Sequence, residues 1–153
     1  MMPGEQLTVM DEQQALRDMH EVMEKLLALS PYAEFCGLRL VKADEEAGSL
    51  SLGMSLRPEL ERIRGSGQFH GGPIASLIDT AACLAVAMRT SSPPPTISMH
   101  VDYLKSAFGP RINATALIRR VGRNLAFVDV DVIDGKNQLV ATGSANLALM
   151  NNS

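Results

Sequence analysis

Apolar residues recur at helical spacing near the start of the chain and predict an amphipathic helix over residues 11–29. Asp11, with Gln14 three positions later, resembles a capping box, so the helix is expected to begin there. Ser30-Pro31 ends it, because proline disfavours a helical conformation in the residue before it. A second short helical turn is expected over residues 31–36.

Alternating apolar and polar residues predict strands in much of the remaining chain. Residues 38–43 and 50–56 are expected to form a hairpin around a turn at 44–48. A polar loop without periodicity follows at 57–70, and long loops of this kind are more often functional than idle. Towards the C-terminus, four further strands read as an antiparallel meander, at residues 96–103, 112–121, 125–133 and 138–150.

Between the loop and the meander lies an apolar segment that predicts a helix over residues 73–89, with Pro73 at its first position. One arc of this helix is expected to pack on a concave sheet, namely Ile74, Leu77, Ile78, Ala81, Leu84, Ala85 and Met88. The opposite arc is built from small residues that another backbone or helix could approach closely, namely Ser76, Asp79, Thr80, Cys83 and Ala87. The order of elements predicts an α+β domain with one sheet.

Composition excludes several classes of function. The 153 residues are 46% hydrophobic and 20% charged, which is typical of one globular domain and argues against disorder. A net charge of −3 gives no electrostatic footprint for DNA or RNA, and the longest apolar run, residues 81–88, is too short to span a bilayer. Cys36 and Cys83 lack metal-binding spacing, and the N-terminus lacks a signal-peptide pattern. We therefore expect a cytoplasmic protein without a metal, a nucleic-acid partner or a membrane segment.

The candidate chemistry lies at the start of the apolar helix. Asp79 is the only charged residue between Pro73 and Arg89, and a carboxylate on an apolar helix often marks a site, because its burial is costly. His70-Gly71-Gly72 leads into the same helix, where free backbone N–H groups stabilise negative charge on an oxygen. Alone, this segment is equally compatible with a tight loop that a histidine caps. Together with Asp79, it suggests that both groups address one carbonyl.

These residues resemble a known family. Residues 67–81, with His70-Gly71-Gly72 and Asp79, resemble the H-G-G-x(6)-D signature of hotdog-fold thioesterases of the phenylacetic-acid-degradation (PaaI-like) family. Residues 96–107, 120–127 and 139–143 resemble the strands that follow it. The likeness covers roughly residues 31–150, in the right order, and is therefore more specific than any single motif.

The resemblance implies a hotdog fold over residues 31–150, in which an antiparallel β-sheet wraps around a long central α-helix. Residues 1–30 would form an N-terminal extension with an amphipathic helix. It also implies a homodimer, or a homotetramer built as a dimer of dimers, with active sites shared at the dimer interface. The implied activity is metal-independent hydrolysis of acyl-CoA or aryl-CoA thioesters, with coenzyme A as part of the substrate and no separate cofactor.

Residue by residue, the resemblance makes Asp79 the general base or nucleophile and the Gly71 N–H the group that polarises the thioester carbonyl. His70 would shape the loop, and Thr96 would orient water across the subunit interface. The phosphates and pantetheine arm of coenzyme A are expected along Tyr103, Arg120, Gly122, Arg123 and Asn124.

One position departs from the family pattern. Many relatives have Asn or Gln six residues before the histidine, where this chain has Arg64. Gln68 or Ser66 could take over that role, Arg64 could favour an acidic substrate, or the chemistry is weakened. Two other function classes stay open. One is a non-catalytic acyl-CoA-binding hotdog protein, and the other is a hydratase or dehydratase that would use His100 with Asp102, which share a strand face.

Overall fold

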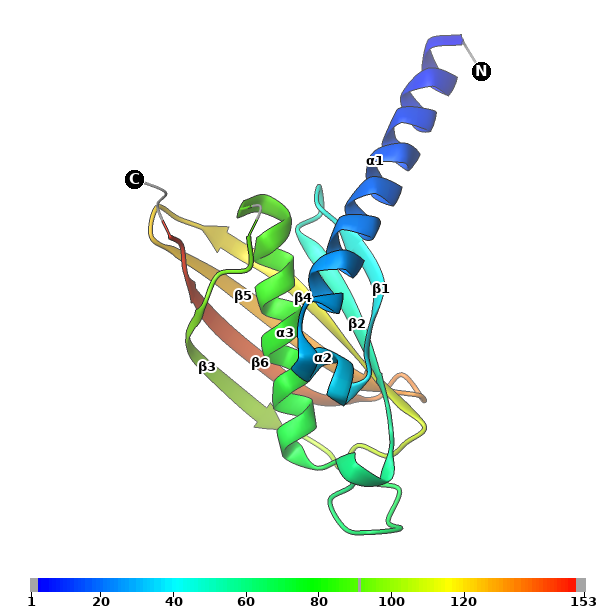
Figure 1. Ribbon diagram of the computed structural model, residues 1–153, viewed down its shortest axis with the longest axis vertical. Helices are drawn as coiled ribbons and strands as arrows, with labels where there is room; N and C mark the ends of the chain where they lie inside the picture. The colour runs from blue at the N-terminus through cyan, green and yellow to red at the C-terminus, as the bar shows by residue number, and fades with distance from the viewer. Residues whose placement is uncertain (1–2, 91, 151–153) are drawn as a thin grey trace.

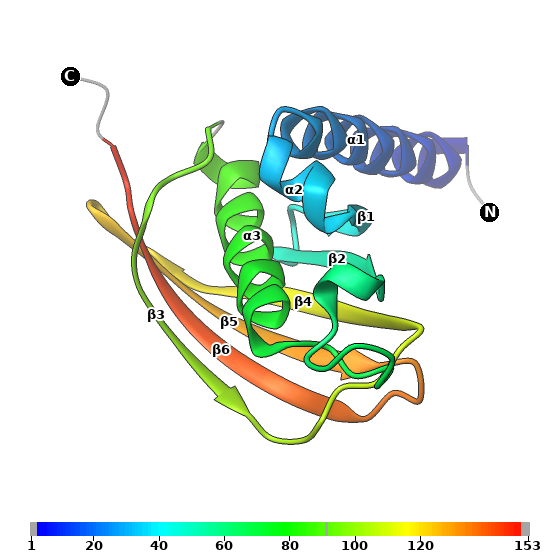
Figure 2. The ribbon, with the colours of Figure 1, turned by 60° about the horizontal axis from the view of Figure 1, so that its bottom comes forward.

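The helical and alternating patterns fold into a curved antiparallel sheet that wraps around one long helix (Figures 1 and 2). The structure is a computed structural model that describes residues 3–90 and 92–150. Its helices are α1 (Pro3–Ala28), α2 (Pro31–Cys36) and α3 (Gly71–Thr90), with a 3₁₀ turn η1 (Pro58–Leu60). Its strands are β1 (Leu38–Asp44), β2 (Ser49–Ser55), β3 (Thr96–Tyr103), β4 (Arg111–Val121), β5 (Leu125–Asp134) and β6 (Leu139–Ala148). This is the α+β architecture that the sequence predicts.

The strands lie in the order β1-β2-β4-β5-β6-β3, and every neighbouring pair is antiparallel. The hairpin β1–β2 and the run β4–β5–β6 are as expected, but the prediction that β3 continues the meander into β4 is wrong. One edge of β4 pairs with β5 and the other pairs with β2, from Ser49 opposite Leu117 to Ser55 opposite Arg111. Because neither edge of β4 is free, β3 pairs with β6 and forms an edge of the sheet.

Alternate side chains of the central strands point into the curve of the sheet and bury against α3. The inner face of β5 consists of Val128, Val130 and Val132, each at most 1% exposed. The predicted inner arc of α3 is also buried, with no member more than 5% exposed. Ala87, on the arc of small residues, is 1% exposed. Helix α1 contacts α3 within the chain (Figure 2).

Helix α3 begins at Gly71, two residues earlier than expected, so Pro73 is its third residue rather than its first. By length and composition alone this helix could cross a membrane, but 56% of its most apolar window is buried inside the molecule. The core helix of a folded domain has the same composition, because it too is surrounded by apolar groups.

Helix α1 begins at Pro3, and the prediction that a capping box starts it at Asp11 is wrong. No proline or glycine lies between Gly4 and Ser30, so no residue in that stretch interrupts the helix. Gln14 instead donates a side-chain hydrogen bond of 2.7 Å to Asp18, one turn further along the helix. The N-terminal half of α1 extends past the edge of the sheet (Figure 1).

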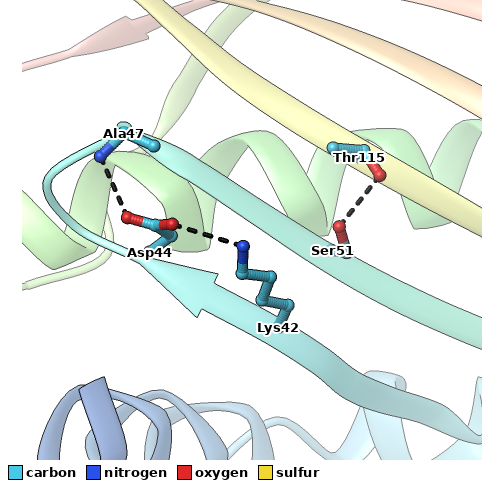
Figure 3. A network of polar contacts seen from close by, with 5 residues as sticks. All are labelled: Lys42, Asp44, Ala47, Ser51 and Thr115. Carbon is cyan, nitrogen blue, oxygen red and sulfur yellow. Dashed lines mark hydrogen bonds and ion pairs between the residues drawn. The ribbon is translucent and has the colours of Figure 1, made fainter. Parts of the chain in front are cut away.

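A carboxylate cap holds the turn between β1 and β2 (Figure 3). Asp44 Oδ1 accepts the Ala47 backbone N–H at 3.0 Å, and Oδ2 lies 3.3 Å from the Lys42 ammonium. The Ala47 N–H, with help from Lys42, holds the pKa of Asp44 below its usual range. The cap contributes its full stability to the hairpin at pH values above the pKa that Asp44 has in the unfolded chain. This contribution is lost as the pH falls through the lower pKa that Asp44 has in the folded protein. Ser51 and Thr115, whose hydroxyls are 2.9 Å apart, join β2 to β4.

Helix α3 packs tightly on β6 at Gly143. A Cβ at this position would lie 2.6 Å from Cγ2 of Ile78, which is closer than packed atoms tolerate. We predict that Gly143→Ala lowers the free energy of unfolding by about 1–3 kcal/mol, the usual effect of overpacking a core. Urea denaturation measures this change.

Two further variants show whether the clash is the cause. In an Ile78→Ala background the effect of Gly143→Ala should disappear, because the clashing methyl is gone. Gly135→Ala is the control, since its Cβ would meet no atom closer than 4.0 Å. An equal loss of stability in both backgrounds would mean that Gly143 acts through something other than Ile78.

Candidate functional site

The loop before α3 is ordered by one acidic side chain. The Glu61 carboxylate accepts the backbone N–H of Gly65 at 2.7 Å and of Gly67 at 2.8 Å. Both glycines have positive φ, of 76° and 69°, which other residues rarely adopt. Arg64, directly before Gly65, is exposed and has no polar partner within the described residues. Gln68 is half-buried, and its carbonyl accepts the Arg62 N–H, so its side chain starts from a fixed backbone.

His70 caps the start of α3. Its Nδ1 accepts the backbone N–H of Gly72 at 3.0 Å, which places the ring proton on Nε2, and its own backbone N–H donates to the Leu60 carbonyl at 2.9 Å. The cap uses one of the free N–H groups at the helix start. The Gly71 N–H has no acceptor in the described part of the chain and remains available to a ligand.

Tyr103, at the end of the edge strand β3, closes over the same glycine. Its hydroxyl donates to the Gly71 carbonyl at 2.8 Å, and a Cβ on Gly71 would lie 3.2 Å from the tyrosine ring. A depression of about 350 Å³ opens beside this contact, lined by Gln68, Phe69, Gly71, Ile74 and Tyr103 together with Arg62 and residues 104–107. The structure thus brings Gln68, Gly71 and Tyr103 together.

Asp79 lies two turns further along α3 and contacts Thr96, the first residue of β3. The Thr96 hydroxyl donates to Asp79 Oδ1 at 2.7 Å, and both side chains are half-buried. One expectation needs correction here, because Asp79 is partly open rather than a buried carboxylate. The expectation that Thr96 orients water across a subunit interface stays a prediction. The hydrogen bond fixes the direction in which the carboxylate points.

Cys83 follows Asp79 by one helical turn. Burial, with a smaller contribution from the Asp79 charge, raises the pKa of the Cys83 thiol to about 11. The thiol therefore stays protonated at neutral pH, and it donates to the Pro94 carbonyl at 3.2 Å. These contacts are those of a packing residue rather than a nucleophile.

Gly71 and Asp79 of one chain are too far apart to act on one carbonyl. They are separated by eight residues of α3, which corresponds to about 12 Å along the helix axis. Asp79 also does not line the depression at Gly71. The expectation that these two groups of one chain address the same carbonyl is therefore wrong, because a rigid helix holds them at a fixed separation.

The residues expected to hold coenzyme A form the tight turn between β4 and β5. The Gly122 N–H donates to the Leu125 carbonyl, and the Leu149 N–H donates to the Asn124 carbonyl, both at 2.8 Å. In the sheet register, Leu147 pairs with Ala126 on one side and with Thr96 on the other, so the turn lies at the Thr96 end of the sheet.

Of the arginines near this turn, Arg119 forms an ion pair with Asp129 at 2.6 Å. Arg120 and Arg123 are exposed, and no carboxylate pairs with either within the described ranges. The structure therefore leaves two cations at the turn free for an anionic ligand.

Glu61 is the site residue that the sequence analysis missed. The available signal was an acidic residue followed, at four and six positions, by glycines in a loop. Across residues 3–90 and 92–150, no group of three or more His, Cys, Asp or Glu side chains is arranged to hold a metal ion.

Comparison with known proteins identifies the family. The Thioesterase superfamily profile matches residues 66–141. A solved structure of a thioesterase-superfamily protein superposes with a TM-score of 0.81 and 31% identity, over 87% of this chain and 99% of that one. The Escherichia coli PaaI protein, from the phenylacetic acid degradation operon, shares the fold, with a TM-score of 0.74 and 19% identity over 87% of this chain and 96% of its own.

Two curated relatives carry a named activity. Acyl-coenzyme A thioesterase 13 of Mus musculus is 29% identical over 85% of this chain and 91% of its own length. The medium/long-chain acyl-CoA thioesterase YigI of Escherichia coli is 26% identical over 90% of this chain and 95% of its own length. Two other curated relatives are matched over 48% and 57% of their lengths. The chain belongs to the thioesterase superfamily and has the hotdog fold.

Proposed function

We propose that this protein hydrolyses acyl-CoA or aryl-CoA thioesters to the free acid and coenzyme A. The observation that carries the proposal is the Asp79 carboxylate, which Thr96 orients at 2.7 Å on an otherwise apolar helix. The free Gly71 N–H at the start of the same helix supplies the complementary group, a donor for an oxyanion. The relatives named as acyl-CoA thioesterases support the same substrate class.

The reaction needs few protein groups, because a thioester is already activated. In the proposed reaction Asp79 accepts a proton from a water molecule as the water oxygen attacks the carbonyl carbon. The Gly71 N–H holds the negative charge that develops on the carbonyl oxygen. The carbon–sulfur bond then breaks, and the proton passes to the departing thiolate of coenzyme A. No separate cofactor or metal takes part in this scheme. Direct attack by Asp79 itself remains the alternative to base catalysis.

A complete site in this proposal combines Asp79 of one chain with Gly71 of a second chain. The fixed spacing of about 12 Å along α3 supports this sharing, since one chain cannot bring both groups to one carbonyl. The edge strand β3 also has an unpaired side and large exposed apolar residues, namely Ile97 at 59%, Met99 at 36% and Tyr103 at 53%. An edge of this kind is a ready surface for pairing with a second copy. We therefore propose a homodimer or a dimer of dimers.

Arg120 and Arg123, with the turn at Gly122 and Asn124, are proposed to hold the phosphates of coenzyme A. Both arginines are exposed and free of carboxylates within the described chain, and guanidinium groups match phosphate oxygens well. The turn also lies at the end of the sheet where Thr96 meets Asp79. Tyr103, by contrast, contacts Gly71, so its proposed role is to support the oxyanion donor rather than the phosphates.

A non-catalytic acyl-CoA-binding protein is the second candidate function. Arg64 favours it, because it stands where many relatives have Asn or Gln and has no polar contact within the described chain. The hydratase reading has less support. His100 and Asp102 do form a pair at 3.1 Å, but their side chains are 73% and 60% exposed, on the sheet face that points away from α3.

Asp79→Asn tests the catalytic proposal. This change keeps the shape and hydrogen bonding of the side chain but removes the base, so hydrolysis of acyl-CoA should fall by about 100-fold or more. Release of free thiol measures the rate, and thermal unfolding should show that the fold survives. Asp102→Asn is the matched control, since it removes an exposed carboxylate outside the proposed site and should change the rate less than about twofold. Activity of Asp79→Asn close to wild type would refute the mechanism.

Arg123→Ala tests the coenzyme A site. Because it removes binding that is equal in the ground and transition states, KM should rise several-fold while kcat changes little. Salt should reduce the difference, since screening weakens phosphate contacts. Arg119→Ala serves as the control, because Arg119 is occupied by Asp129 and is not expected to meet the substrate. An unchanged KM for Arg123→Ala at low salt would remove this residue from the site.

Mixing two inactive variants tests whether the site is shared. Asp79→Asn lacks the base, and Gly71→Pro lacks the N–H at a helix position where proline is tolerated. In a mixed dimer, one site carries both defects and the other carries neither. An equal mixture, refolded together, should therefore regain about a quarter of the wild-type activity. Sedimentation and thermal unfolding of each variant alone show that both are folded dimers. No recovery with intact mixed dimers would mean that each chain holds its own complete site.

A further inference from the structure

Arg57 is a charged side chain that the chain itself does not neutralise. It follows β2 at the start of η1 and is largely covered by protein. Its Nε and Nη2 atoms are buried and have no hydrogen-bond partner among the described residues. The Phe35 ring lies over the guanidinium, with 5.8 Å between its centroid and Cζ. An aromatic face attracts the cation but offers no acceptor for its N–H groups.

The other arginines of the described chain that are held in place have acceptors. Arg119 pairs with Asp129, and Arg89 donates to the carbonyls of Glu45 and Glu46. A guanidinium that is desolvated without an acceptor is unfavourable, because it loses its hydration and gains no hydrogen bond in return. Arg57 therefore has the properties of a binding site for an anion that this chain does not itself supply.

An aromatic surface connects Arg57 with the turn of α3 that precedes Asp79. Phe35 stacks on Tyr32 with 6.4 Å between ring centroids, and the two rings, 58% and 55% exposed, form what we term the aromatic shelf. The Tyr32 hydroxyl lies 2.8 Å from Ser76 Oγ, which itself donates to the Gly72 carbonyl at 3.0 Å. Ser76 precedes Asp79 by three residues, so their side chains are neighbours on the helix surface.

We propose that Arg57 binds a carboxylate at the far end of the acyl group, so that the preferred substrates are acyl-CoA thioesters whose acyl chain ends in a carboxylate. This inference rests on the thioesterase function proposed above. An acyl chain that leaves Asp79 along the aromatic shelf crosses 6.4 Å from Tyr32 to Phe35 and a further 5.8 Å to the guanidinium. Short acyl groups cannot reach it, so the selectivity belongs to medium-length or aromatic acyl groups.

The geometry of a guanidinium explains why we expect a carboxylate, rather than another terminal group, at the end of the acyl chain. A guanidinium presents two N–H groups along one edge, and a carboxylate accepts both at once. A carboxylate that reaches Nη1 would also lie next to the unpartnered Nη2, because both nitrogens are bonded to the same carbon. The approach runs over two aromatic rings, which suits an apolar acyl chain better than the hydrophilic nucleotide part of coenzyme A.

The test compares two substrates of equal length, a medium-chain acyl-CoA and the matching ω-carboxyacyl-CoA, with the full-length protein. Wild type should prefer the carboxylated substrate, and Arg57→Met should lower its kcat/KM about tenfold or more while the neutral substrate changes less than about twofold. Arg57→Lys keeps the charge without the planar edge and should be intermediate. Arg39→Met, at an exposed arginine of β1, is the matched control and should change neither rate.

Thermal unfolding, sedimentation and inhibition by coenzyme A test whether Arg57 pairs instead with a partner subunit or with the coenzyme A phosphates. Because Arg57→Met removes an unpaired charge and fills the space, the melting temperature should stay the same or rise. A lower melting temperature with dissociation and unchanged selectivity would mean that a partner subunit neutralises Arg57, and would overturn the proposal. Equal losses for both substrates, with weaker inhibition by free coenzyme A, would assign Arg57 to the phosphates and would also overturn it. The proposal would also be overturned if Arg57→Met kept the wild-type preference for the carboxylated substrate.

Failure of the thioesterase proposal can be distinguished from failure of the Arg57 proposal. If wild type hydrolyses neither substrate, the thioesterase proposal is refuted, and calorimetric binding then tests Arg57 alone. Wild type should bind the ω-carboxyacyl-CoA about tenfold more tightly than the neutral one, and Arg57→Met should bind both equally. Equal binding of the two by wild type would overturn the role of Arg57.

Discussion

The depth at which α3 lies in the curved sheet determines the rest of the structure. At Gly143 no side chain separates β6 from Ile78, so the helix packs directly on the sheet backbone. The residue after Ile78 is Asp79, and the strand beyond β6 is β3. The Asp79 carboxylate accepts the Thr96 hydroxyl of this edge strand at 2.7 Å. A single glycine thus links the packing of the core to the geometry of the site.

The rigidity of α3 sets a second constraint. It holds Gly71 and Asp79 at opposite ends of about two helical turns, and no side-chain rotation closes a gap of about 12 Å. The start of the helix is fixed equally firmly, because Glu61 holds the loop, His70 caps the first turn and Tyr103 bonds to the Gly71 carbonyl. A preorganised donor of this kind needs no reorganisation when charge develops, which is the property that oxyanion stabilisation requires.

Charged and polar side chains have different partners on the two sides of the sheet. On the outer face, Arg119 pairs with Asp129, and His100 lies 3.1 Å from Asp102, and these groups remain accessible to water. On the side of the helices, Asp79 accepts one hydrogen bond from a hydroxyl, and the buried Nε and Nη2 of Arg57 have no acceptor within the described residues. Groups of this kind are unfavourable in a free protein unless a ligand or a second chain completes them. This is why the site and the proposed carboxylate contact lie on the helix side.

The sequence by itself determined most of the elements and the residues at the start of α3. The spacing of apolar residues predicts the buried arc of α3, because one face of a helix must meet the core, and the motif from His70 to Asp79 contains the residues of the proposed site. It also led to errors at positions where the chain offered two compatible local structures. Asp11 resembles a cap, yet the helix continues through it, since nothing before it stops a helix.

Only the tertiary structure decided which strands pair and which distant side chains contact each other. The alternation in residues 96–103 is the same whether β3 pairs with β4 or β6, and the choice depends on β2, which is distant in sequence and occupies the other edge of β4. The contacts of Thr96 with Asp79 and of Arg57 with Phe35 join segments that no periodicity relates. Local sequence encodes local conformation through backbone sterics and hydrophobic spacing. Which strand edge stays free, and which charge stays unpaired, depends on how the whole chain fills its core.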